Sequence, residues 1–156
     1  MNASEAMDPN PTTLKPGDTV ECAAKYIMKH RYRNLPVVDE NSCYVGMFGV
    51  NCLLKLVIPK AVFYPRGLEN VSFIHESFED LSHHFDEVKD QPISICLNKE
   101  IKSVTPDTPL TEIMLQLYNT RASIPVVEAG SCKLLGMISY WDIGEKIIAA
   151  GDSKDA

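Results

Sequence analysis

Apolar residues recur with the same helical spacing in two stretches of the chain. In each stretch they stand at positions i, i+3, i+4, i+7 and i+8, which places them on one face of an α-helix. The first set is Val20, Ala23, Ala24, Ile27 and Met28, and the second is Leu110, Ile113, Met114, Leu117 and Tyr118. The pattern predicts two amphipathic helices, one in each half of the chain.

Each predicted helix is followed by two short apolar runs bounded by turn residues, which is the pattern of β-strands. A second helix is predicted after each pair of runs, over 50–58 and about 140–149. A short extended segment ended by proline precedes each first helix, over 11–16 and 101–106. Each half therefore has the order extended, α, β, β, α. The apolar runs are 35–38 and 44–48 in the first half, and 124–127 and 134–138 in the second.

The two halves are copies of one unit, because Pro125 follows Pro36 by 89 residues and Gly136 follows Gly46 by 90. A repeated unit with an open apolar face usually buries that face against its copy. We therefore predict one globular module of the mixed α/β (α+β) class. Its parts are a flexible lead-in (1–10), repeat one (11–58), a linker with one helix (59–92), repeat two (93–149) and a tail (150–156).

The chain of 156 residues carries a formal net charge of −6, which argues against a general affinity for nucleic acid or for anionic membranes. No apolar run approaches the roughly 20 residues of a membrane-spanning helix, and the N-terminus lacks the pattern of a signal peptide. Five cysteines without a C-x-x-C spacing predict reduced thiols in a cytoplasmic protein, with neither a disulfide framework nor a zinc site.

Motifs typical of enzymes are missing from the sequence, which has no Gly-rich phosphate loop and no Ser-His-Asp order. His83 and His84 are adjacent on the predicted linker helix, so their side chains point about 100° apart and cannot share one metal ion well. We expect no catalytic activity, no metal site and no obligatory cofactor.

Ser139 and Asp142 stand at the predicted junction between a strand and the last helix. A helix N-terminus carries free N–H groups and a partial positive charge, which attract phosphate. A carboxylate at the same place can accept hydrogen bonds from the two hydroxyls of a ribose. The pair can therefore hold a nucleotide by its sugar and its phosphate. The alternative is a capping box, in which Ser139 caps the helix and Asp142 reaches back to it.

The paired strand motifs, each followed by a turn and a Gly-Met step, resemble those of tandem CBS domains, known together as the Bateman module. The resemblance covers roughly 11–58 and 93–149. It implies two intertwined β-α-β-β-α repeats packed through their sheets with pseudo-two-fold symmetry, often paired into a disc-shaped homodimer. It also implies two clefts per chain for adenosine derivatives such as AMP, ADP, ATP or S-adenosylmethionine. The motifs are Leu35-Pro36-Val37-Val38 with Gly46-Met47, and Ile124-Pro125-Val126-Val127 with Gly136-Met137.

In ligand-binding members of that family, a Thr or Ser lies near the phosphate and an Asp three residues later takes the ribose hydroxyls. Ser139 and Asp142 match this pattern, whereas the first repeat has Gly49 and Cys52 at the corresponding positions. A thiol cannot hold a ribose diol as a carboxylate can. We therefore predict one competent cleft, in the second repeat, and a weak or empty first cleft.

The same resemblance implies the other contacts of the second cleft. The two basic residues Arg33 and Arg121 precede the first strands of the two repeats, where family members often aim basic side chains at phosphates. The alternative is that these arginines are solvated or cap helix ends. The adenine is expected between the extended segment and the first strand of the second repeat, against Ile101, Ser103, Ile124, Pro125 and Val126.

These features predict a regulatory, energy-sensing module that binds an adenosine nucleotide and signals through a rearrangement of the module or its dimer. A partner protein, which the sequence does not identify, would respond to that rearrangement. The alternative is a ligand-free structural or dimerisation module, favoured by the degenerate first cleft and by the capping interpretation of Ser139.

Overall fold

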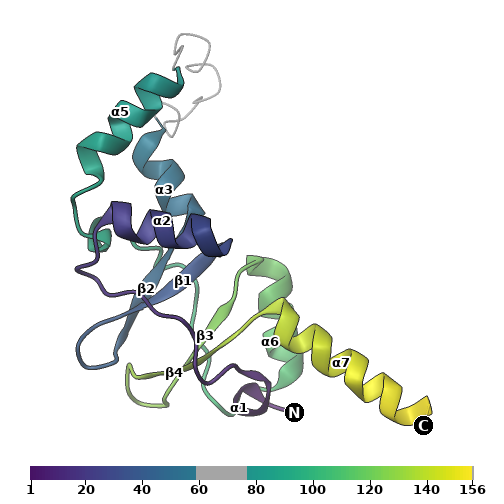
Figure 1. The fold of residues 1–156 in the computed structure, drawn as a ribbon. Helices are drawn as coiled ribbons and strands as arrows, with labels where there is room; N and C mark the ends of the chain where they lie inside the picture. The colour runs from purple at the N-terminus through teal and green to yellow at the C-terminus, as the bar shows by residue number, and fades with distance from the viewer. Residues whose placement is uncertain (59–76, 156) are drawn as a thin grey trace.

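The computed structural model describes residues 1–58 and 77–155 and contains both predicted repeats (Figure 1). The first repeat consists of α2 (Val20–His30), β1 (Asn34–Val38), β2 (Tyr44–Gly49) and α3 (Val50–Val57). The second consists of α6 (Leu110–Thr120), β3 (Ile124–Val127), β4 (Leu134–Ile138) and α7 (Tyr140–Asp155). The other elements are α1 (Ala3–Ala6), α5 (Phe78–Val88) and the 3-10 helix η2 (Ile93–Cys96).

The two segments outside the repeats also contain helix. Helix α5 lies in the segment predicted as a linker and packs beside α3 (Figure 1). The rest of that linker, 59–76, lies outside the described residues. Helix α7 continues to Asp155, so the segment expected to be a tail extends the last helix instead.

Each repeat is built on one antiparallel hairpin, with Pro36 opposite Met47 in the first and Pro125 opposite Met137 in the second. The extended segment before each first helix adds a parallel neighbour to its own hairpin. Leu14 pairs with Val37, and Val104 pairs with Val126. The predicted repeat of an extended segment, a helix, two strands and a helix is therefore present twice, with the same pairing.

The outer edge of each hairpin is paired by a segment from the other repeat. Asp8 and Met137 exchange two backbone hydrogen bonds of 2.8 and 3.0 Å, and Asn98 and Met47 exchange two of 2.8 and 2.9 Å. The segment that leads into repeat one thus completes the sheet of repeat two, and the reverse holds as well. This exchange is the physical basis of the intertwined arrangement.

The prediction that residues 1–10 form a flexible lead-in is wrong. Residues 3–6 form α1, which begins with a capping box between Asn2 and Glu5. Ala3 and Ala6 are 0% and 1% exposed and belong to the core of the second repeat. A Cβ atom at Gly136 would lie 2.5 Å from the carbonyl oxygen of Asp8, so only glycine lets the segment approach β4 this closely.

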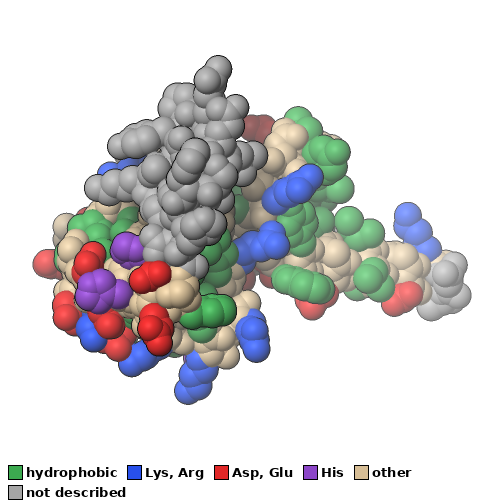
Figure 2. Space-filling model, turned by 90° about the horizontal axis from the view of Figure 1, so that it is seen from above, with side chains coloured by type: hydrophobic (Ala, Val, Ile, Leu, Met, Phe, Trp, Pro, Cys, Tyr) green, Lys and Arg blue, Asp and Glu red, His purple; other side chains and the backbone are tan. Residues whose placement is uncertain are grey.

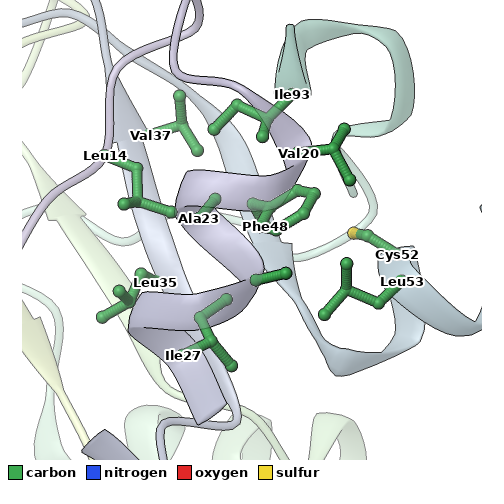
Figure 3. Close-up of a cluster of buried hydrophobic side chains, with 11 residues drawn as sticks. Leu14, Val20, Ala23, Ile27, Leu35, Val37, Phe48, Cys52, Leu53 and Ile93 are labelled. Carbon is green, nitrogen blue, oxygen red and sulfur yellow. The ribbon is translucent and has the colours of Figure 1, made fainter. Parts of the chain in front are cut away.

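Each repeat has its own apolar core, and a third cluster joins them. Figure 3 shows the first core, in which Phe48 lies among side chains from α2 and α3. The second core gathers residues of α1, α6, β3 and β4. The cluster between the repeats contains Met47, Ile101, Ala122 and Met137. Met47 and Met137 hold corresponding positions, as expected for repeats related by a pseudo-two-fold axis.

Cys43 and Cys132 form a disulfide, so the prediction that all five cysteines are reduced is wrong for these two. They stand in the turns of the two hairpins, 89 residues apart in sequence and 4.8 Å apart between Cα atoms. The turns are also joined by hydrogen bonds from the Tyr44 amide to the Cys132 carbonyl and from the Leu134 amide to the Ser42 carbonyl. The two cysteines meet only when the repeats pack, so no local spacing of cysteines predicts the bridge.

Candidate functional site

Ser139 and Asp142 lie where β4 ends and α7 begins, as the sequence pattern predicts. The Ser139 amide and hydroxyl both donate to Asp142 Oδ2 at 2.7 Å, and the Asp142 amide donates to Ser139 Oγ at 3.3 Å. This is the geometry of a capping box. The structure therefore contains the capping box, which engages one carboxylate oxygen and the hydroxyl.

The second carboxylate oxygen of Asp142, Oδ1, receives no hydrogen bond from the described residues, and the side chain is half-buried. A carboxylate has about four lone-pair sites, so it can keep its capping bonds and still accept donors at Oδ1. The cap and a ribose contact are therefore chemically compatible at Asp142.

The residues expected around the adenine divide by burial. Ile124, Pro125 and Val126 are fully buried in β3, and Ile101 is 8% exposed in the cluster between the repeats. Ser103, two residues after Ile101, is exposed. The apolar side chains belong to the core, so a ligand here would meet their edges and the exposed Ser103.

Arg33 and Arg121 come together although they belong to different repeats. Both line a groove of about 440 Å³ between α6 and α7, and Arg33 Nη1 donates to the Arg121 carbonyl at 3.5 Å. Arg121 ends α6 in the left-handed conformation, with φ of 54°. The Tyr140 hydroxyl donates to the Leu117 carbonyl at 2.5 Å and ties the start of α7 to α6. The other lining residues are Met114, Leu117, Tyr118, Ile143 and Gly144.

The candidate residues do not share one pocket. Tyr140, Ile143 and Gly144 turn one face of α7 toward the arginine groove, whereas Asp142 is about 200° around the helix from Tyr140. The structure therefore places the ribose candidate and the phosphate candidates on different sides of the first turn of α7. The Ser139–Asp142 pattern and the family resemblance suggested the two sets, but neither could place one set relative to the other.

The corresponding junction of the first repeat is filled by protein. A Cβ atom at Gly49 would lie 2.3 Å from the Arg33 carbonyl oxygen and 2.6 Å from the Asn34 Cβ. Cys52 is 4% exposed and lies in the first core near Phe48 and Leu53 (Figure 3). Neither a hydroxyl nor an exposed carboxylate is available at this junction.

Cys52 also has an electrostatic environment that the sequence did not suggest. A hydrogen bond from Cys96, together with backbone hydrogen bonds at Gly49 and Asn98, lowers the pKa of the Cys52 thiol to about 6. The same contact raises the pKa of Cys96. Cys52 lies in the first turn of α3, where the helix dipole also favours a thiolate. The two cysteines come from segments far apart in sequence, so no local motif revealed the pair.

His83 lies 3.5 Å from Glu87 on α5, as the helical spacing suggests. Within 1–58 and 77–155, no group of three or more His, Cys, Asp or Glu residues could hold a metal ion. No helix in the described part of the chain is both long enough and apolar enough to cross a membrane.

Two repeats that exchange their leading segments define an intertwined pair of α+β units with one polar strand-to-helix junction. The family model of the CBS domain matches residues 3–58 and 88–148, so the chain belongs to the CBS domain family. The matches span both repeats and include α1, which the sequence pattern had left out of the first unit.

Individual relatives are distant in sequence but similar in fold. An uncharacterized 17.7 kDa protein of Acidianus ambivalens is 22% identical over 86% of this chain, and the match spans 66% of that protein, slightly less than two thirds. The crystal structure of CBSX2 in complex with AMP has a TM-score of 0.69 at 20% identity, covering 96% of this chain and 98% of that one. The crystal structure of CbpB in complex with c-di-AMP has a TM-score of 0.71 at 14% identity, covering 99% and 90%.

Proposed function

We propose that this protein is a regulatory CBS-pair module that binds an adenosine nucleotide at the second repeat. The observation that carries the proposal is the half-buried Ser139–Asp142 pair, with Oδ1 of Asp142 free of the described residues, at a junction whose counterpart is closed. Structures of similar fold contain AMP or c-di-AMP. The ligands that we would test are AMP, ADP, ATP and S-adenosylmethionine.

In this proposal Asp142 accepts the ribose hydroxyls at Oδ1, and the adenine lies beside Ser103 at the edge of Ile101 and β3. Arg33 and Arg121 supply positive charge for the phosphates. The arginine groove lies on the other side of the first turn of α7. The arginine side chains, or α7 itself, must therefore move for an arginine to reach the phosphate of a ligand held by Asp142. A ligand held by both sets would therefore favour a different arrangement of α7 from the capped one.

The signal would pass through a homodimer to a partner protein in the cytoplasm, without catalysis. Exposed apolar side chains on α6 and α7 support pairing of two chains, since patches of this kind mark interaction sites. Figure 2 shows such side chains along the projecting helix, next to basic ones. The most exposed are Trp141 (80%), Tyr118 (78%), Ile148 (66%), Leu115 (61%) and Ile147 (53%). The same apolar face favours the second candidate function, a dimerisation module without a ligand.

The test is the melting temperature of the protein with each nucleotide, with Asp142→Ala beside the wild type. A ligand at about 100 times its dissociation constant adds about 2.7 kcal/mol, which is a rise of about 5–10 °C for a chain of this size. We expect the rise in the wild type and its loss in Asp142→Ala.

The chain offers a matched control, because Ser77 and Asp80 form a second capping box at the start of α5. Asp80→Ala removes an equivalent cap from a helix outside the proposed cleft and should keep the nucleotide response. No response of the folded wild type to any of the four ligands would favour the dimerisation module. An equal response in Asp142→Ala would remove the ribose role of this residue.

A further inference from the structure

The Cys43–Cys132 disulfide joins the hairpin turns of the two repeats. The Asp39 amide donates to the Cys43 carbonyl and the Glu128 amide donates to the Lys133 carbonyl, so Cys43 corresponds to Lys133 and Cys132 stands one residue before that position. Cys43 and Lys133 form an isolated antiparallel bridge at this point. The disulfide therefore links the repeats directly, between the two segments that begin β2 and β4.

The bridge lies at the surface and outside both repeat cores. Cys132 is exposed and Cys43 is half-buried, whereas the neighbouring Tyr44 hydroxyl is buried at the interface between the repeats. A thiol or disulfide in solution can therefore reach the sulfur of Cys132. Among the five cysteines, the remaining three are free, namely Cys22, Cys52 and Cys96.

Reduction of the bridge leaves other contacts between the two turns in place. The hydrogen bonds Tyr44 N–H to Cys132 O (2.8 Å) and Leu134 N–H to Ser42 O (3.0 Å) do not depend on the sulfur atoms. The turns themselves are held locally, because Asp39 Oδ1 accepts from the Cys43 amide at 3.0 Å and Ser131 Oγ accepts from the Lys133 amide at 3.1 Å. These contacts would keep the two turns side by side in the reduced protein.

We propose that Cys43 and Cys132 are a reversible redox site that clamps the two repeats together when oxidised and loosens them when reduced. The chemistry is exchange with a low-molecular-weight disulfide such as oxidised glutathione. The thiolate of Cys132 attacks that disulfide and releases one thiolate, and the thiolate of Cys43 then attacks the mixed disulfide and releases the second. Two protein thiols are oxidised, one small disulfide is reduced to two thiols, and the two protons pass to the released thiolates.

This inference rests on the proposed cytoplasmic location and is independent of nucleotide binding. Disulfides in cytosolic proteins are usually transient and regulatory, while those of exported proteins are permanent. An exposed bridge between two repeats whose turns are also joined by hydrogen bonds fits the first kind.

The experiment equilibrates the purified full-length protein at a series of ratios of reduced to oxidised glutathione. The samples are then acid-quenched, denatured and labelled with a thiol-specific mass tag. We expect three labelled thiols under oxidising conditions and five under reducing conditions, with peptide mapping assigning the change to Cys43 and Cys132. The melting temperature of the oxidised form should be higher by about 5–15 °C, because the link closes a long loop in the unfolded chain.

Two variants and one control complete the test. Cys43→Ser and Cys132→Ser should each melt near the reduced wild type, and oxidised glutathione should form at most a mixed disulfide on the remaining cysteine, with no bridge within the chain. Cys22→Ser, which removes an exposed thiol outside the pair, should respond as the wild type does. The proposal is overturned if the pair stays reduced in excess oxidised glutathione or stays oxidised at every ratio. Equal melting temperatures of the two forms, or a bridge found between chains, would overturn it as well.

Discussion

The two repeats share a backbone arrangement but differ where strand meets helix. At the end of β4 stand a hydroxyl and a carboxylate, Ser139 and Asp142, half-buried and hydrogen-bonded to each other. At the end of β2 stand Gly49, against the Arg33 carbonyl, and Cys52, in the core. The difference shows that two repeats can share a hairpin while one junction is polar and the other is packed interior.

The largest expected loss of stability comes from a substitution in the first core, which also contains Cys52 of the first junction. Phe48 is fully buried and stands in the place that Ile138 takes in the second repeat. Phe48→Ala should lower the free energy of unfolding by about 4 kcal/mol, because large-to-small core changes lose burial and leave a cavity. Urea denaturation measures the loss, and Ile138→Ala serves as the matched change. A loss below about 1 kcal/mol for Phe48→Ala would contradict the packing in Figure 3.

The next effect tests whether the first junction has room for a polar side chain. Gly49→Ser should destabilise the protein by about 3 kcal/mol, because the new Cβ would lie 2.3 Å from a backbone oxygen. Gly17→Ser is the control, since nothing lies within 4 Å of a Cβ at Gly17. The comparison is made by thermal or urea unfolding. A stable Gly49→Ser protein would mean that the first junction has room for a hydroxyl.

Cys52 gives the first repeat a contribution to stability that depends on pH. The folded-state pKa of Cys52 is lowered to about 6 from a usual value of 9.0, so the unfolded state binds the extra proton between these values. Stability from this group is present above the unfolded pKa and is lost as the pH falls through 6. The slope is at most about 1.4 kcal/mol per pH unit.

The check is the unfolding free energy of the wild type and Cys52→Ser at several values between pH 6 and 9. We expect stability to rise with pH more steeply in the wild type than in the variant. Thiolate absorbance of the folded protein should also titrate near pH 6 and should lose this step in Cys52→Ser. Identical slopes for the two proteins would show that Cys52 stays protonated.

The smallest effect concerns the cap itself. Ser139→Ala removes the acceptor for the Asp142 amide and should lower stability by about 1 kcal/mol. Ser77→Ala removes the same acceptor from α5 and should have a similar effect. Chemical denaturation measures the capping role of each serine, and ligand titration measures a role in nucleotide binding. A nucleotide response that falls only in Ser139→Ala would show that Ser139 has both roles and Ser77 only the first.

The repeat and the secondary structure could be predicted because apolar spacing is a local property of the sequence. The helical stripe from Leu110 to Tyr118 and the two Pro-Val-Val motifs each have counterparts at an offset of 89 or 90 residues. Ser139 and Asp142 could be placed at a helix start for the same reason. The family resemblance then supplied the asymmetry between Asp142 and Cys52.

What the sequence could not reveal depends on contacts between distant segments. Helix α1 buries only two small side chains, Ala3 and Ala6, so it leaves almost no apolar signal. The Cys43–Cys132 bridge and the Cys52–Cys96 contact exist only after the repeats pack. The convergence of Arg33 and Arg121 also depends on packing between the repeats, and spacing within one repeat does not encode it.

The exchanged leading segments have a consequence for how the chain is made. The edge of the first hairpin is completed by Asn98 and that of the second by Asp8, so both sheets stay incomplete until most of the polypeptide has been synthesised. Contacts of such long sequence separation slow folding and leave strand edges open in the meantime. A gene fragment encoding one repeat alone would lack the strand that its partner supplies, so the two units have to be inherited, expressed and folded together.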